Sequence, residues 1–170
     1  MIESTELCTG FPPIIPPEPK VLILGTMPSV VSLREDFYYA HSRNAFWPIM
    51  ASLFGESPTS KKEKSVLCQK KGIFLWDVLQ ACQRKGSLDS AIQRPVANDF
   101  ESLFQRYPDL KNVAFNGKAA EKLFQKEVLS VQDLPKSLHF ISLPSTSPAY
   151  AAMSLESKRL LWQEKLSFLL

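Results

Sequence analysis

Short apolar runs alternate with amphipathic segments along this chain. Runs of this kind are typical of strands buried on both faces of a sheet, and they cover residues 20–24, 72–79, 110–116 and 138–143. In residues 44–54 the apolar side chains recur at helical spacing, and Pro48 places the helix start around residues 44–46. Further helices are expected over residues 60–71, 99–107, 117–128 and 154–168.

Four strands that alternate with helices predict an α/β fold. We expect a three-layer sandwich, in which helices flank both faces of a central, mainly parallel four-stranded sheet. Ligands of such sheets bind beyond the carboxyl ends of the strands. The segments that follow the strands, at residues 25–29, 76–77, 116–117 and 144–149, are therefore where functional groups are expected.

The remaining segments carry weaker patterns. Residues 11–19 contain five prolines and are expected to be extended, and residues 80–95 are expected to form a polar loop. Asn98 and Glu101 resemble a capping box that opens the helix at 99–107. In the last helix, the side chains expected to face the core are Leu155, Trp162, Leu166 and Leu169.

Composition narrows the class of protein without naming a function. The 170 residues suit one domain over 1–170, and an apolar content of 45% with 22% charged residues is ordinary for a globular protein. A net charge of +3 is compatible with a polyanionic partner but does not indicate one. Three widely spaced cysteines and two histidines favour neither a disulfide framework nor a zinc site. With no signal peptide or membrane span evident, we expect an intracellular protein.

Three polar features within residues 25–44 have alternative interpretations. The turn at residues 25–29 contains one glycine, so it is neither a P-loop nor a dinucleotide fingerprint, and it is either a phosphate or sugar cradle or an ordinary turn. Asn44 is either the N-cap of the following helix or a carboxamide that orients a water or a substrate oxygen. His41 is either a general base or a structural residue.

Other candidates are aromatic or lie after later strands. Tyr39 precedes the helix at 44–54 and is the best of the nearby rings for stacking on a base, whereas Phe46 and Trp47 suit the core. Asp77 follows a buried strand, where a carboxylate is costly unless it reads a ligand or caps the next segment. The hydroxyl-rich residues 145–147 either hold phosphates or form a solvated loop.

Four segments, taken together, resemble the uracil-DNA glycosylase superfamily. They are "LILGTMPSVVSL", "YYAHSRNAFWPI", "VAFNGKAAEKLF" and "LPSTSPA", and they occur in the superfamily's order at the predicted strand ends. The second segment, with "GIFLWDVLQACQRKGSLDSAI" and the lead-in "GFPPI", is most similar to the sixth family, the hypoxanthine-DNA glycosylases. The resemblance spans about residues 11–165. It implies a parallel four-stranded sheet flanked by helices, and an enzyme that hydrolyses the N-glycosidic bond of damaged bases in DNA.

The resemblance also implies roles for individual residues. Many superfamily members carry an Asp or Asn that activates or positions water at the place where this chain has Met27. The Met27 side chain cannot hydrogen-bond a water. The sixth family also lacks that residue and uses the Asn of an "HPRN" element instead. The matching residues here are "HSRN", so Asn44 is expected to be catalytic and Ser42 replaces the usual Pro. Tyr39 is expected to stack on a base rotated out of the duplex. Asp77 and the backbone near Thr26 and Met27 are expected to hydrogen-bond that base.

The same resemblance implies contacts with the DNA backbone. Ser29, Ser145 and Ser147 are expected to hold phosphates, and residues 146–149, which include Thr146 and Pro148, are expected to fill the gap left in the duplex. Three cysteines cannot supply the four ligands of the iron–sulfur cluster found in some relatives, so no metal or cofactor is expected.

The sequence therefore predicts a monofunctional DNA glycosylase that acts as a monomer on double-stranded DNA containing a damaged base. Hypoxanthine is the favoured substrate, and uracil or mismatched thymine is the alternative within the class. Two readings from other classes stay open, namely a catalytically inactive nucleic-acid-binding domain, because of Met27, and a small hydrolase of unrelated type.

Overall fold

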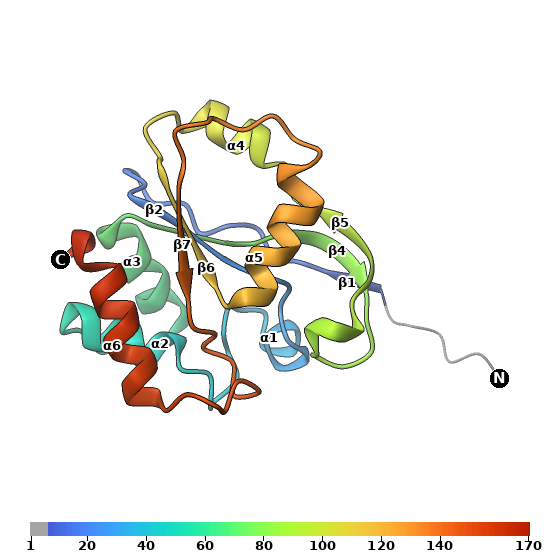
Figure 1. Ribbon diagram of the computed structural model, residues 1–170. Coiled ribbons are helices and arrows are strands. Elements are labelled where there is room, and N and C mark those ends of the chain that lie inside the picture. Colours follow the sequence, from blue (N-terminus) through green and yellow to red (C-terminus); the bar gives the residue numbers. More distant parts are fainter. Residues whose placement is uncertain (1–6) are drawn as a thin grey trace.

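The computed structural model describes residues 7–170, which contain a central sheet of four parallel strands (Figure 1). The register pairs Gly25 with Asp77 and Asn116 with Leu143, so the carboxyl ends of all four strands meet at one edge. In spatial order the strands are β3 (Ile73–Asp77), β2 (Val21–Gly25), β6 (Asn112–Asn116) and β7 (His139–Leu143).

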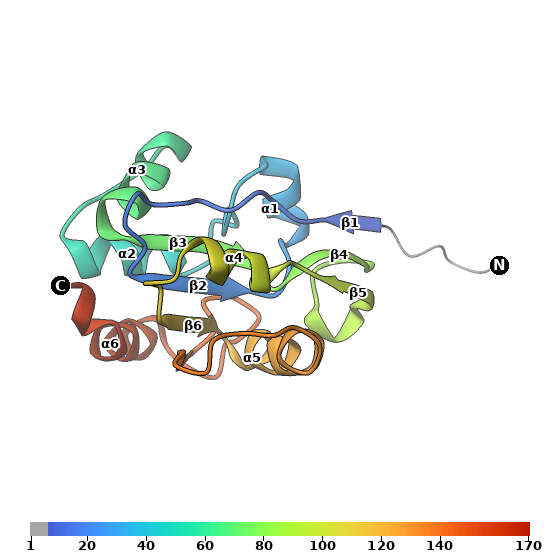
Figure 2. The same cartoon turned by 90° about the horizontal axis from the view of Figure 1, so that it is seen from above.

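Helices cover both faces of this sheet. In β2, Val21 and Ile23 belong to one core while Leu22 and Leu24 belong to the other, so successive side chains are buried on opposite faces. The first core is completed by α2 (Phe46–Phe54), α3 (Lys61–Lys71) and α6 (Leu155–Lys165), and the second by α4 (Phe100–Arg106) and α5 (Lys118–Phe124). The two views show helices on either side of the central strands (Figures 1 and 2). The predicted three-layer α/β fold is confirmed.

The expectation of a polar loop over residues 80–95 is wrong at both ends. Residues 80–83 and 93–95 belong to a second sheet, whereas residues 84–92 form the connection between its strands. This sheet is three-stranded and antiparallel, of order β1-β4-β5, and is formed by β1 (Leu7–Thr9), β4 (Leu79–Gln83) and β5 (Gln93–Ala97). Cys8 of β1 lies directly opposite Cys82 of β4 in the strand register, and both thiol side chains are buried in the second core. The connection from β4 to β5 contains a short 3-10 helix, Asp89–Ala91. This sheet forms because the distant β1 pairs with β4, a contact that local sequence patterns do not reveal.

Helix α1 (Val30–Glu35) lies between the turn at residues 25–29 and Tyr39, in a segment for which no helix was predicted. The Ser29 hydroxyl caps it by accepting a hydrogen bond from the Ser32 N–H at 3.1 Å. Helix α4 is capped by Asp99 rather than by Asn98, so the capping-box prediction is wrong. The Asn98 amide donates instead to the Asp77 carbonyl at 2.8 Å and ties the end of β3 to β5.

The remaining elements follow the sequence pattern closely. Helix α3 runs between the cap Ser60 and the left-handed Gly72, and a π-helical turn, Gln125–Leu129, follows α5. Residues 11–19 contain a single antiparallel bridge, from Ile14 to Leu75 at the free edge of β3. Within residues 7–170, no helix is long and apolar enough to cross a membrane.

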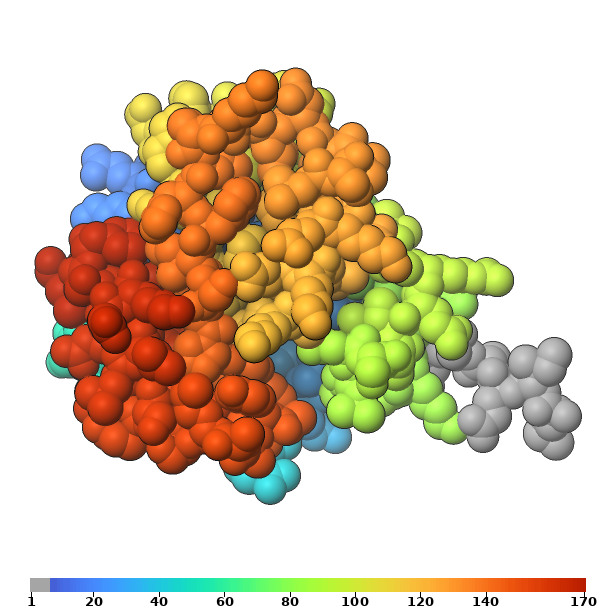
Figure 3. Space-filling model, viewed as in Figure 1, coloured from blue at the N-terminus to red at the C-terminus, as the bar shows by residue number. Residues whose placement is uncertain are grey.

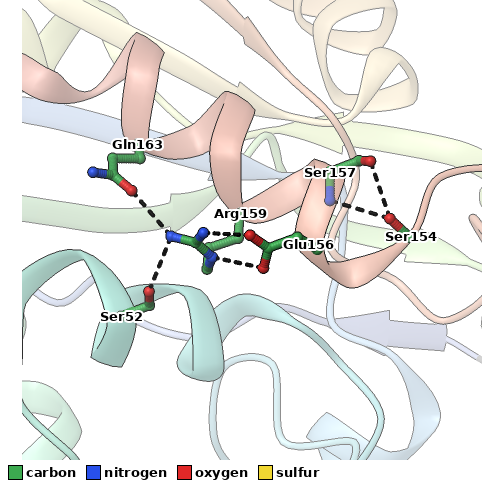
Figure 4. Close-up of polar contacts among 6 residues, drawn as sticks. All are labelled: Ser52, Ser154, Glu156, Ser157, Arg159 and Gln163. Carbon is green, nitrogen blue, oxygen red and sulfur yellow. Dashed lines mark hydrogen bonds and ion pairs between the residues drawn. The ribbon is translucent and has the colours of Figure 1, made fainter.

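Helix α6 is capped at its start and contacts α2 through polar side chains. Ser154 caps the helix through the Ser157 N–H at 3.1 Å, and Arg159 binds Glu156 through two hydrogen bonds and reaches Ser52 of α2 at 3.5 Å (Figure 4). A 3-10 turn, Ser167–Leu169, follows α6. Of the four side chains expected in the core, Trp162, Leu166 and Leu169 are buried, whereas Leu155 is 54% exposed because it lies in the first turn of the helix.

Candidate active site

A hollow opens at the carboxyl edge of the central sheet. Its volume of about 110 Å³ is several times the roughly 10–15 Å³ that one water requires. Nine of the ten residues predicted for a site line it, and they are Thr26, Met27, Ser29, Tyr39, Asn44, Asp77, Ser145, Thr146 and Ser147. Pro148 lines a neighbouring surface depression that also touches Asn44. Residues from four separate segments of the chain therefore meet at the carboxyl edge of the sheet, where functional groups were expected.

The turn after β2 forms one wall of the hollow. Met27 is 7% exposed and packs into the second core, so its side chain supports the wall and offers no hydrogen bond. The Thr26 hydroxyl donates to Asp89 Oδ1 at 2.6 Å. The buried guanidinium of Arg84 donates to the Pro28 carbonyl and so ties this turn to the end of β4.

Asp77 places a carboxyl group at the inner end of the hollow. Its side chain is 4% exposed, and the Oδ2 atom is buried without a hydrogen-bond partner among the described residues. Burial raises the pKa of Asp77 to about 7, the negative charge of Asp89 adds to the rise, and the positive charge of Arg84 opposes it. An unpartnered buried carboxyl is costly, so it marks a place where a ligand would be held.

Tyr39 lies beside Asp77 and is held in an unusual backbone conformation, with φ of 52°. Its ring stacks on the fully buried Phe46, at 4.3 Å between centroids. Burial, and after it the charge of Asp77, raise the pKa of Tyr39, so the hydroxyl keeps its proton. The nearby Asn116 side chain opposes this rise in the pKa of Tyr39. Even so, the buried Tyr39 hydroxyl has no partner with hydrogen-bond geometry among residues 7–170.

Gly25 makes room for both groups. A Cβ atom at this position would lie 2.6 Å from Asp77 Oδ1 and 2.9 Å from the Tyr39 hydroxyl, closer than real Cβ contacts. Only a residue without a side chain therefore leaves the inner end of the hollow open.

The first alternative role of Asn44 is wrong, because the N-cap of α2 is Ala45, which makes no side-chain capping hydrogen bond. Asn44 lies one residue earlier. Its Oδ1 accepts a hydrogen bond from the Phe46 N–H at 2.9 Å, which helps to start α2. Because that N–H can only donate, the bond fixes which end of the amide is oxygen. The Asn44 side chain also lines the hollow, so the second role, contact with a water or a substrate, is geometrically open to it.

The loop after β7 closes the opposite wall. Thr146 is 1% exposed, and it exchanges two hydrogen bonds with Asn116, both at 2.9 Å. The Trp162 indole donates to the Pro144 carbonyl at 2.9 Å, and the Lys158 amine donates to the Ser147 carbonyl at 3.3 Å. Burial lowers the pKa of Lys158. The loop is thus anchored to β6 and α6, and its Thr146 carbonyl accepts from the Ala45 N–H at 2.9 Å, beside Asn44.

Seven lining residues were not among the ten predicted, and they are Gly25, Pro28, Ser32, Tyr38, Ser87, Asp89 and Asn116. Three of them, Gly25, Pro28 and Asn116, lie in strand-end segments where functional groups were expected. Asn116 ends β6, so its place at the strand edge was the available signal. Ser87 and Asp89 come from the connection between β4 and β5, and no local pattern marks them. The exposed Asp89 is a second carboxyl group in the hollow.

A larger depression of about 600 Å³ adjoins the hollow and shares Ser87, Asp89, Asn116, Ser145 and Ser147 with it. In Figure 3 the orange loop after β7 and the green segment around residues 84–91 face each other across a furrow, with blue residues of the N-terminal part visible between them. The part of the chain that the structure describes contains no cluster of three or more His, Cys, Asp or Glu side chains able to hold a metal ion.

Comparisons with known proteins identify the family of this chain. The family model for the uracil DNA glycosylase superfamily matches residues 12–166. The chain is 40% identical over 111 residues to a hypoxanthine DNA glycosylase of Methanosarcina barkeri, covering 64% of this chain and 70% of that protein. It is 36% identical over 113 residues to a hypoxanthine DNA glycosylase of Methanosarcina acetivorans, covering 65% of this chain and 72% of that protein.

A solved structure is similar to this chain in fold and sequence. It is a solution NMR structure of a protein from Methanosarcina acetivorans, provisionally assigned as a uracil DNA glycosylase, with a TM-score of 0.80 and 30% identity. The match covers 96% of this chain and 99% of that one. The predicted family and the predicted class of enzyme, a DNA glycosylase, are confirmed. This chain belongs to the uracil DNA glycosylase superfamily.

Proposed function

We propose that the protein is a monofunctional glycosylase that removes hypoxanthine from double-stranded DNA and acts as a monomer. One observation carries the proposal. Two buried polar groups, Asp77 Oδ2 and the Tyr39 hydroxyl, have no hydrogen-bond partner within residues 7–170, and they lie at the inner end of a hollow that Asn44 also lines. Both curated relatives are named hypoxanthine DNA glycosylases, which favours that base as the group that would satisfy them.

A base inside a duplex is out of reach, so it must rotate into the hollow before the bond to the sugar can break. The Tyr39 ring, backed by Phe46, supplies a rigid surface for stacking. Asp77 and the backbone N–H groups of Thr26 and Met27 then hydrogen-bond the edge of the base. The hydrogen bonds gained offset the cost of burying these polar groups.

Asn44 positions the water that attacks the sugar. As the bond from C1′ to the base lengthens, the sugar gains positive character, and a water must approach it from the other side. A carboxamide is too weak a base to remove a proton, so its contribution is orientation. The bond from the Phe46 N–H holds the amide still while it does so.

The loops around the hollow hold the DNA strand. Ser29, Ser145 and Ser147 lie beside the opening and offer hydroxyl and N–H groups to phosphates. Pro148 and Ala149 fill the space that the base leaves. The side chain of Thr146 takes a different role from the expected wedge: because it is buried against Asn116, it holds the loop in shape.

Uracil is the second candidate substrate, because the similar solved structure is assigned to the uracil DNA glycosylases. The test uses duplexes that carry one hypoxanthine, one uracil or one G·T mismatch, treated with protein and then with alkali. We expect cleavage of the strand at hypoxanthine, with slower cleavage or none at the others. Preferential cleavage at uracil would make uracil, and not hypoxanthine, the substrate. Tight binding to every duplex without cleavage would indicate an inactive binding domain.

Closing the space beside Gly25 should abolish excision. We expect Gly25→Ala to displace Asp77 and Tyr39, to lower the free energy of unfolding by about 1–3 kcal/mol, and to prevent binding of the base. Gly55→Ala is the matched control: Gly55 has a φ of +64° and no neighbour within 4 Å, so it should cost stability without affecting excision. Excision by Gly25→Ala at the wild-type rate would contradict the assignment of the hollow.

A further inference from the structure

We propose that Asp77 is the general acid of the reaction, donating a proton to the departing purine, and that Asp89 keeps that proton on Asp77 until the base arrives. This inference rests on the proposed function and deepens it. It assigns a role to Asp89, which the mechanism above does not use, and it explains why a purine is favoured.

The two carboxyl groups of the hollow have different environments. Asp77 ends a central strand and is 4% exposed, whereas Asp89 is exposed and accepts a hydrogen bond from the Thr26 hydroxyl at 2.6 Å. Solvent and a hydrogen-bond donor both stabilise a negative charge, and both are available to Asp89 but not to the buried Oδ2 atom of Asp77. A second negative charge in the same hollow is then unfavourable, and the more buried Asp77 holds its proton.

The other groups that face Asp77 do not reverse this order. The Tyr38 and Tyr39 hydroxyls, from the loop after α1, are raised in pKa and stay neutral. Arg84, at the end of β4, carries the one positive charge that acts on Asp77 among the described groups, and it lowers the pKa less than burial and Asp89 raise it. With a pKa of about 7, Asp77 is poised to give up a proton near neutral pH.

The proton has a defined path. When the bond from C1′ to N9 breaks, its electron pair goes to N9, and the Asp77 proton goes to a second ring nitrogen of the purine, N7 or N3. The base therefore leaves as neutral hypoxanthine. The water held by Asn44 bonds to C1′ through its oxygen and loses a proton to the solvent. After the base has left, Asp77 takes up a proton from the solvent, which restores the enzyme.

This path selects purines. Hypoxanthine keeps lone pairs on N7 and N3 while it is attached to the sugar, and N7 is a hydrogen-bond acceptor on every purine. Uracil has no second ring nitrogen with a free lone pair, because one is bonded to the sugar and the other carries hydrogen. Acid assistance at a ring nitrogen is consequently available to the purine alone.

The pH dependence of kcat/KM for hypoxanthine excision tests the inference, because this ratio reports the free enzyme. The reaction needs protonated Asp77, so kcat/KM should be constant at low pH and fall tenfold per unit above about pH 7. Asp89→Asn removes the neighbouring negative charge, so the fall should begin at lower pH. Asp77→Asn keeps the shape but has no proton to transfer, so the rate should drop about 10²–10⁴-fold and lose this pH dependence.

Asp109→Asn serves as the control, since Asp109 is exposed in the turn before β6, away from the lining residues, and its pH profile should match the wild type. Thermal melting of every variant confirms that it is folded. The inference is overturned if Asp77→Asn keeps the wild-type rate and profile, or if Asp89→Asn leaves the fall at the same pH. If the wild type still releases hypoxanthine, either result overturns only the proton-transfer role of Asp77. If the wild type releases no hypoxanthine, the proposed function is overturned as well.

Discussion

Asn44→Ala should lower the rate of hypoxanthine excision by on the order of 10²-fold or more, because a misplaced water rarely attacks the sugar. The same change removes the acceptor for the Phe46 N–H and should cost about 1 kcal/mol of stability. The folded protein should still bind DNA, since the serines that contact the strand are untouched. Single-turnover excision and thermal unfolding, measured side by side, separate the two effects.

Two other variants show which property of Asn44 matters. Asn44→Asp keeps an oxygen for the Phe46 N–H and another for the water, so it should excise far faster than Asn44→Ala. Ser60→Ala is the control for the loss of a cap alone, because the Ser60 hydroxyl accepts from the Glu63 N–H at 3.0 Å, at the start of α3. It should lose similar stability with no change in excision. An Asn44→Ala protein that cleaves as fast as the wild type would refute the assignment.

Asn116→Ala should have the second largest effect. It removes both hydrogen bonds to Thr146, whose N–H and hydroxyl are then left buried and unpartnered. Each of the two orphaned groups costs about 1–3 kcal/mol, so we expect the free energy of unfolding to fall by about 2–6 kcal/mol. The loop that carries Ser145 and Ser147 should relax, and affinity for lesion-bearing duplex should fall with excision.

Asn112 offers a matched control on the same strand. It begins β6, is only partly buried, and donates to the Lys20 carbonyl at 3.2 Å, at the opposite end from the hollow. Asn112→Ala should cost about 1 kcal/mol or less and leave excision unchanged. Equal losses of excision in the two variants would mean that overall stability, and not the loop, controls activity.

The sequence predicts the central sheet well because β2, β3 and β6 are apolar runs that are almost entirely buried. The edge strand β7 was predicted from a similar run, although it is partly exposed. The second sheet escapes the pattern, since β4 (LQACQ) and β5 (QRPVA) are neither continuous apolar runs nor regular alternations, and β4 pairs with the distant β1. Helix α1 escapes because it has only six residues, although Ser29 is a recognisable cap in retrospect. Leu155 shows that helical spacing does not reveal where a helix leaves the core.

The site is predicted to a similar extent, and for a related reason. Residues at strand ends, such as Asp77, and those in motifs beside them, such as Tyr39 and Asn44, meet because parallel strands end at one edge. Asp89 could not be found in this way, because its position depends on how the connection between β4 and β5 folds back over the hollow. The burial of Thr146 depends likewise on its pairing with Asn116, thirty residues away.

The most direct test of the account is a crystal structure of the protein bound to a duplex that contains 2′-fluoro-2′-deoxyinosine, in which the fluorine disfavours positive charge on the sugar and slows cleavage. We predict that hypoxanthine lies in the hollow, stacked on Tyr39 with its edge at Asp77, and that Asn44 holds a water facing C1′. A base that stays stacked in the bound duplex, or one that binds elsewhere while the hollow stays empty, would contradict the account.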